Sequence, residues 1–209
     1  MVCSDLYRRN SYERSVVSRS CRRTSCEEKS LVFCVCAVAE VAADIHERGA
    51  KQYGLMRSGG SLIRQSQLHI TVRYIGSYPL RLPKAIVAKA RLAGSFFEFP
   101  EFSAELDVLG SFLSPRSQAP CVLSGSRSVA SLMEAQWQLG LAMTKAGLDV
   151  LQDDNFDPHI TLFYHRQSVE RRRIEPVRLK IGELVLIHSL YGLTRHIVLE
   201  RWPLGVKRR

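Results

Sequence analysis

The sequence predicts an α+β fold made of two similar units related by a pseudo-twofold axis. Segments typical of strands and helices alternate along the 209 residues, in the order strand, helix, strand, helix, strands, helix, strands. The same His-Ile-Thr phrase also occurs twice, as LHITVRYIG over residues 68–76 and as PHITLFYH over residues 158–165. Each copy lies in a strand-like apolar run, at corresponding positions of the two halves. A chain of this length can form one domain with a core, or two small lobes.

The chain is expected to begin with a disordered basic tail over residues 1–29, which is rich in Ser, Arg and Cys and has no apolar periodicity. Residues 30–209 are then expected to form a single two-lobed domain. The run LVFCVCAVAEVAA at residues 31–43 could pass for a signal-peptide core, but it follows two acidic residues and contains Glu40. Because it is also shorter than the ~20 apolar residues that span a membrane, we interpret it as a buried strand running into a helix.

The other elements follow from apolar periodicity and from the Gly and Pro residues at their ends. The expected order is strand 30–38, helix 39–54, strand 65–76, helix 82–94, strands 102–112 and 120–125, helix 126–147, and strands 158–165, 182–192 and 195–204. Pro83 suits the first turn of its helix, and Gly94 suits the C-terminal cap of the same helix. A Ser is expected to cap the start of the longest helix, and Gly147 follows its last turn.

The charge balance is strongly basic, with 30 Lys+Arg against 20 Asp+Glu and a formal net charge of +10. Such a surplus favours nucleic acids, nucleotides or anionic lipids as partners. The basic residues cluster near the N-terminus, in HRQSVERRR at residues 165–173, and in the last three residues. Only the second cluster is close in sequence to a His-Ile-Thr phrase.

The six cysteines show no strong metal-ligand spacing, and Cys34 and Cys36 share one face of a predicted strand. Free thiols in a reducing cytosol are therefore expected, which favours a cytoplasmic protein without a disulfide framework. A metal site built from His159 and His165 would lack a carboxylate or Cys at a suitable spacing, so no metal is expected.

The two His-x-Thr pairs carry the candidate chemistry. On a strand, residues two apart point to the same side, so His69 shares a face with Thr71, and His159 shares a face with Thr161. Two such strands across a cleft would present two imidazoles and two hydroxyls. One neutral His can take a proton from water, and the other, protonated, can give one to a leaving oxygen. The Thr hydroxyls suit phosphate oxygens, so the set fits displacement at a phosphodiester without a metal.

The remaining histidines are expected to play no part in the chemistry. His165 has the same strand parity as His159, which predicts a position at the outer edge of the cleft. His188 and His196 lie in the terminal strands without a Thr two residues on, so structural roles are expected.

The phrases LHITVRYIG and PHITLFYH resemble the paired signature motifs of the 2H phosphoesterase superfamily. Within it, the chain is most similar to the bacterial RNA 2′,3′-cyclic phosphodiesterases, often labelled 2′-5′ RNA ligases. The opening LVFCVCAVAEVAADI resembles that family's first strand and helix, and the closing GELVLIHSLYGLTRHIVLERWPL resembles its final hairpin. The likeness runs from about Leu31 to Leu204 and leaves out the N-terminal tail.

The resemblance implies a two-lobed fold in which two antiparallel sheets flank a central cleft, with helices outside. It also implies hydrolysis of a 2′,3′-cyclic phosphate on RNA ends or nucleotides to a 2′-phosphomonoester. By position, His69 and His159 are the general acid and base, in an order that the sequence leaves open, and Thr71 and Thr161 hold phosphate oxygens. No cofactor, no metal and no membrane partner are expected, and the protein is expected to be a monomer.

Two positions depart from the family's pattern. Tyr74 stands where family members often carry a Phe that stacks on a base, and a Tyr can still stack. Tyr164 stands where many carry an Arg near the phosphate; Arg73, which strict alternation places on the His69 face, or Arg166 could supply the cation instead. The same alternation places both tyrosines on the opposite face, so their place in the site follows from the resemblance.

Two other functions remain open on the sequence. The same site could act on 2′-5′-linked oligonucleotides, in hydrolysis or in reversible ligation. Alternatively, the chain could be an RNA-binding module that draws affinity from its basic clusters and has no turnover. The doubled His-Thr set argues against plain binding, because binding does not require two imidazoles.

Overall fold

Three helices and nine strands make up the part of the chain that the computed structural model describes, namely residues 29–56, 59–78, 81–112, 118–126, 129–149, 156–190 and 195–205. A short 3-10 turn at Gln65–Gln67 leads into the third strand. The elements are β1 (Lys29–Val35), α1 (Ala39–Gly54), β2 (Gly60–Leu62), β3 (Ile70–Ser77), α2 (Lys84–Phe96), β4 (Phe102–Ser111), β5 (Ala119–Ser124), α3 (Ala130–Lys145), β6 (His159–His165), β7 (Arg172–Ile181), β8 (Glu183–Leu190) and β9 (Arg195–Pro203).

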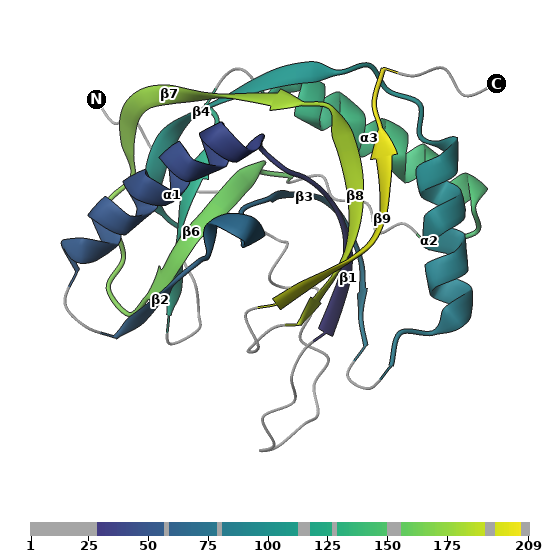
Figure 1. Cartoon of the computed structure of the whole chain (residues 1–209), viewed down its shortest axis with the longest axis horizontal. Helices are drawn as coiled ribbons and strands as arrows, with labels where there is room; N and C mark the ends of the chain where they lie inside the picture. Colours follow the sequence, from purple (N-terminus) through teal and green to yellow (C-terminus); the bar gives the residue numbers. More distant parts are fainter. Residues whose placement is uncertain are drawn as a thin grey trace, which may run out of the picture.

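The strands form one curled antiparallel sheet in the order β7-β4-β5-β6-β3-β1-β8-β9, with β2 added to β6 (Figure 1). The two motif strands, β3 and β6, are neighbours at its centre and are joined through one residue pair, Ile70 with Ile160. Four strands lie on each side of this junction, β7-β4-β5-β6 on one and β3-β1-β8-β9 on the other. This arrangement confirms the predicted α+β fold, with the two expected antiparallel sheets joined into one curled sheet by the pairing of β3 with β6.

Strand β1 shows how the two faces of the sheet differ. Leu31, Phe33 and Val35 point to the main core, whereas Val32 and Cys34 point to the other face, where they pack against β8. The main core is closed by buried residues of all three helices: Ile45 of α1, Ala90 and Ala93 of α2, and Leu132, Leu139 and Met143 of α3. The helices therefore cover one face and leave the opposite face available for a cleft.

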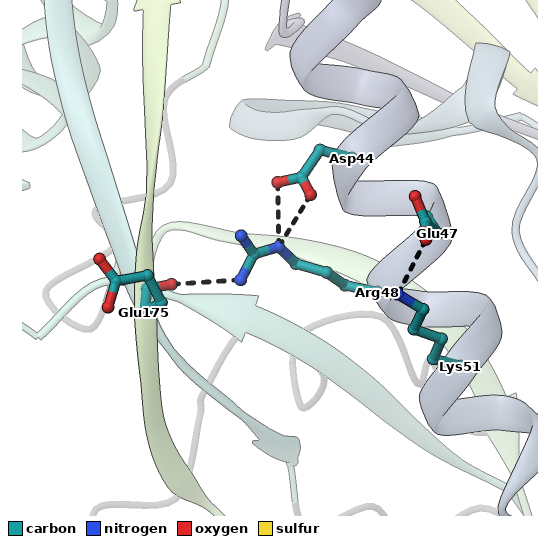
Figure 2. Close-up of polar contacts among 5 residues, drawn as sticks. All are labelled: Asp44, Glu47, Arg48, Lys51 and Glu175. Atoms are coloured by element: carbon teal, nitrogen blue, oxygen red, sulfur yellow. Dashed lines mark hydrogen bonds and ion pairs between the residues drawn. The ribbon is translucent and has the colours of Figure 1, made fainter.

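Helix α1 packs on the sheet through its apolar face, and polar side chains also connect it to the edge strand β7. Figure 2 shows the contact between Arg48 and Glu175. Arg48 donates to Asp44 one turn earlier and to the Glu175 carbonyl of β7, at 3.4 Å. From the other side, Arg172 of β7 donates to the Gln52 side chain at 2.7 Å. These contacts are exposed or half-exposed and orient the helix, since surface ion pairs contribute at most about 1 kcal/mol to stability.

Most predicted elements are confirmed, with corrections at the helix ends. Helix α1 occupies the predicted residues, and Gly147 follows α3 with φ +75°, as a C-terminal glycine does. Gly94 does not cap α2: it is buried two residues before the helix ends, against the ring of Trp202. The predicted Ser cap of α3 is also wrong, because Val129 precedes the first helical residue and makes no side-chain cap.

Strands β2 and β7 are absent from the sequence prediction. The apolar positions of β7 are Val177, Leu179 and Ile181, but an arginine-rich start and Pro176 hide the alternation. β7 is an edge strand, where a proline is tolerated because one side of the backbone has no partner. Three of its cations are paired with carboxylates. Arg173 pairs with Asp107 and Arg178 with Glu105, both of β4, and Lys180 pairs with Glu101, the residue before β4.

The predicted tail at residues 1–29 lies outside the described residues apart from Lys29, the first residue of β1. Among the described helices, none is both long and apolar enough to cross a membrane.

The contact of Gly94 with Trp202 predicts that adding a single methyl group at position 94 lowers the stability of the fold. A Cβ at Gly94 would overlap the buried ring of Trp202, so Gly94→Ala should lower the free energy of unfolding by about 1–3 kcal/mol. Gly54→Ala is the matched control, because its Cβ would meet no atom within 4 Å and should leave stability unchanged or raised by up to about 1 kcal/mol. Urea unfolding measures both; equal stabilities of the two variants would contradict the packing.

Candidate active site

The two motif strands bring four predicted site residues into one cavity. His69, Thr71, His159 and Thr161 all line a cavity of about 510 Å³. Because Ile70 faces Ile160 in an antiparallel pair, continuing this register sets His69 across from Thr161 and Thr71 across from His159. The two isoleucines point into the core and are each 1% exposed, so all four polar side chains lie on the opposite face.

Both histidine rings are held in the same way. The Nδ1 atom of His69 lies 2.7 Å from the Gln67 carbonyl oxygen, and that of His159 lies 2.7 Å from the Asp157 carbonyl oxygen. A carbonyl oxygen only accepts, so each Nδ1 carries the proton and donates it. In the neutral form of each ring, Nε2 is therefore the basic nitrogen, the one that can exchange a proton with a substrate or water.

A bulge follows each motif threonine and changes which residues reach the cavity. In β3, Thr71 pairs with Cys34 and Arg73 pairs with the preceding Phe33, so Val72 is an extra residue. In β6, the same interruption leaves Leu162 without a partner on β5. Each bulge shifts the alternation by one residue, and both Val72 and Leu162 are buried.

The shifted alternation places the two tyrosines in the cavity. Tyr74 and Tyr164 both line it, where the resemblance expected them and strict alternation did not. The hydroxyl of Tyr74 donates to Ser77 at 2.8 Å, which fixes one edge of its ring. Tyr164 is half-buried and is a neutral residue at the place where the family pattern has a cation.

Arg73 is not in the cavity, and its predicted role as a substrate-binding cation is wrong. The bulge turns its side chain toward α3, where it is buried and its Nε donates to the Gln136 carbonyl oxygen at 2.9 Å. Gly140 leaves room for the guanidinium, since a Cβ there would lie 2.5 Å from Nη2. Arg73 thus joins a central strand to a helix.

The prediction for His165 is also wrong, for the same reason. The bulge at Leu162 moves His165 from the cleft edge into the interior, where it is 2% exposed. Its Nδ1 accepts from the Gln167 backbone at 3.0 Å, and its ring packs on Tyr53. Arg166, the other predicted source of a cation, is exposed and lies beside Gly59 at the end of β6.

Two cavity residues come from β9 and were not expected. Arg195 and His196 line the cavity, although their strand is three places from β3 in the sheet. The sheet curls, with β9 at the end beyond β8 (Figure 1), and residues of β9 line the same cavity as residues of β3. No local sequence pattern indicates this. The structural role predicted for His196 did not include a place in the cavity, where its ring meets that of His69.

The rings of His69 and His196 meet edge to face, with centroids 4.9 Å apart and planes at 79°. His159 has a matching neighbour in Phe112, at 4.8 Å and 86°. Burial lowers the pKa of His196 to about 4, with a further effect from His69. Burial also lowers the pKa of His69, helped by the nearby His159 and opposed by the hydrogen bond to Gln67.

The electrostatics of the cavity suit an anion. Among the described residues that line it, Arg195 supplies a permanent positive charge and there is no Asp or Glu. Within the described part of the chain, no three His, Cys, Asp or Glu side chains gather into a group that could hold a metal ion. The described lining of the cavity therefore includes three imidazoles, two threonine hydroxyls, two tyrosines and one guanidinium.

A curled antiparallel sheet with two His-x-Thr strands at its centre defines the class: the chain has the LigT-like fold and resembles the 2H phosphoesterases, as the motifs predicted. E. coli LigT complexed with 3′-AMP is 26% identical, with a TM-score of 0.64 over 86% of this chain and 100% of that chain. A phosphoesterase is 23% identical, with a TM-score of 0.63 over 85% of this chain and 99% of that chain.

TT0787 of Thermus thermophilus shares the fold at 19% identity, with a TM-score of 0.67 over 86% of this chain and 100% of that chain. No protein-family model and no curated protein matches the sequence. The similarity to LigT supports the interpretation that the protein is an enzyme with a function of the 2H phosphoesterase type.

The contact between His69 and His196 predicts a measurable change in titration. His196→Ala should admit water to the His69 ring and raise the pKa of His69 toward its ordinary value, because desolvation disfavours the charged form. His196→Phe keeps an aromatic ring in place and should keep the pKa of His69 low. NMR titration of the imidazole resonances measures both, and a pKa of His69 that is identical in the wild type and the alanine variant would contradict the contact.

Proposed function

We propose that the protein is a metal-independent phosphodiesterase that hydrolyses 2′,3′-cyclic phosphates of RNA ends or nucleotides to 2′-phosphomonoesters. The observation that supports this most is the pair of motif histidines in one cavity, each held through Nδ1 by a backbone carbonyl and each opposite a threonine. E. coli LigT, with which the chain shares its fold, has been crystallised with 3′-AMP and with NADP+, which supports nucleotide binding in this cavity.

The proposed reaction is an in-line displacement at phosphorus. A neutral imidazole takes a proton from water, the water oxygen forms a bond to phosphorus, and the bond from phosphorus to O3′ breaks. The second imidazole, protonated, gives its proton to O3′, which leaves a 2′-phosphate and a free 3′-hydroxyl. Thr71 and Thr161 donate to the non-bridging oxygens, whose charge grows in the transition state.

The surroundings of His69 support an order for the two histidines. The base must be neutral before the reaction, and burial lowers the pKa of His69. We therefore assign the base to His69 and the acid to His159. The acidic limb of the pH–rate profile should report the pKa of His69 and lie below the ordinary range of histidine.

The tyrosines provide the platform for the base of the nucleotide. Tyr74 and Tyr164 line the cavity, one from each half. The ring of either tyrosine can stack on any nucleobase, because every base has a flat aromatic face. We propose Tyr74 as the stacking residue, because its hydroxyl is already held by Ser77. The three described cysteines are free thiols, of which Cys34 and Cys121 are buried, and this supports a cytoplasmic location. We also propose that the enzyme acts as a monomer.

Replacing either motif histidine should remove turnover without unfolding the protein. His69→Ala and His159→Ala are each expected to lower kcat for a nucleoside 2′,3′-cyclic phosphate by about 10²–10⁴-fold, the usual contribution of one acid or base. The matched control is His46→Ala, an imidazole of α1 outside the cavity, which should retain wild-type kcat. Product analysis by phosphorus NMR identifies the monoester, and all assays are repeated with a strong chelator.

The outcomes separate the remaining functions. Full activity in either cavity variant would contradict the two-histidine mechanism, and loss of activity with the chelator would indicate a metal enzyme. An activated phosphodiester has a leaving group that needs no proton, so His159→Ala should cleave it faster than His69→Ala does. If His69→Ala were the faster variant, His69 would be the acid and His159 the base. Turnover of 2′-5′-linked oligonucleotides alone, or RNA binding without any turnover, would replace the proposed reaction.

A further inference from the structure

The cavity is larger than the reacting phosphate requires. Its volume of about 510 Å³ lies within the range of pockets that enclose whole small ligands. The histidines and threonines of β3 and β6 occupy one part of its wall. The part toward β8 and β9 is lined by Ser189, Leu190, Arg195 and His196, none of which the proposed chemistry uses.

Arg195 is the charged group of this second part. It is the first residue of β9, pairs with Leu190 of β8, and is exposed. Among the residues that the structure describes, it makes no ion pair, whereas Arg173 and Arg178 of β7 are paired with carboxylates. A guanidinium at the mouth of a cavity whose described lining has no carboxylate is suited to a second anion.

The position of Arg195 separates it from the reacting centre. His69 and Thr71 are half-buried inside the cavity, while Arg195 is exposed at its mouth. The link between them is His196, the neighbour of Arg195, whose ring covers His69. In a nucleotide, the 5′-oxygen and the 2′,3′-oxygens lie at opposite ends of the ribose. A sugar with its cyclic phosphate between the histidines would therefore have its 5′ end free to extend toward the mouth.

We propose that Arg195 forms a subsite for the 5′-phosphate group of the nucleotide that carries the cyclic phosphate. The inference rests on the proposed function and narrows its substrate class. The preferred substrates are RNA 3′ ends or 5′-phosphorylated nucleotides, rather than nucleosides with a free 5′-hydroxyl. The fork of a guanidinium matches two phosphate oxygens, which an ammonium group cannot do.

Tyr164 supplies no charge to the β6 side of the cavity. The family pattern places a cation beside the second motif, and here that position holds a half-buried tyrosine. The cation of this cavity lies instead on the β9 side, next to the ring that covers the first motif histidine.

The test compares three substrates: adenosine 2′,3′-cyclic phosphate, its 5′-phosphorylated form, and the dinucleotide ApA ending in a 2′,3′-cyclic phosphate. The wild type should favour the second and third over the first by about 10–100-fold in kcat/KM, the effect of a charged hydrogen-bonded pair. Arg195→Ala should bring these ratios close to one, and Arg195→Lys should retain part of the preference. Arg81→Ala, an exposed arginine outside the cavity, should keep the wild-type ratios.

Each result decides one point. Unchanged kcat/KM ratios in Arg195→Ala would overturn the subsite. An equal loss of kcat/KM on all three substrates would also overturn it, because Arg195 would then serve the reacting phosphate. A preference shared by the two 5′-phosphorylated substrates assigns the subsite to the phosphate group, and a preference for the dinucleotide alone assigns it to the phosphodiester of an RNA chain. Both of these outcomes support the subsite.

A binding measurement keeps the subsite testable if no substrate is turned over. Calorimetry compares adenosine 2′-phosphate with adenosine 2′,5′-bisphosphate on the wild type and on Arg195→Ala. Tighter binding of the bisphosphate in the wild type alone would support the subsite while the proposed reaction fails. Equal binding of the two compounds by the wild type would overturn the subsite whatever the outcome of the activity assay.

Discussion

The site depends on one backbone pairing, that of Ile70 with Ile160 at the centre of the sheet. This is the single point at which β3 and β6 are joined, and both isoleucine side chains are buried in the core beneath it. Because His69 and Thr71 flank one isoleucine and His159 and Thr161 flank the other, the pairing fixes all four polar side chains on the same face. Core packing below the sheet thus sets the geometry of the cavity above it.

Each half then uses the same local devices to aim its residues. The ring of each motif histidine is held by the carbonyl two residues earlier, and each motif threonine is followed by a bulge. The bulges return Tyr74 and Tyr164 to the cavity face, and each motif ring is covered edge-on by another ring. The residues that cover the two motif rings differ. Phe112, beside His159, is apolar, whereas His196, beside His69, is polar and is preceded by Arg195, which also lines the cavity. The two halves therefore share their backbone geometry. They differ in the side chains that cover the motif histidines.

The sequence predicted what depends on local pattern. Seven of the nine described strands, the three helices and the His-x-Thr pairs follow from apolar periodicity and from the two copies of one phrase. Arg73 and His165 were misplaced because strict alternation does not include bulges, and a bulge of one residue exchanges the two faces of a strand. β7 was missed because its exposed face is charged and its proline is allowed at an edge. Arg195 and His196 were not predicted because the curl of the sheet, which brings β9 to the cavity, is a property of the whole fold.

We propose that both halves of the sheet act on one phosphate group. A crystal structure of the wild type with a nucleoside 2′-phosphate tests it most directly. The phosphorus is expected between the Nε2 atoms of His69 and His159, with the hydroxyls of Thr71 and Thr161 within about 2.5–3.0 Å of the phosphate oxygens. A phosphate that contacts the residues of one half alone, or that binds outside the cavity, would contradict it.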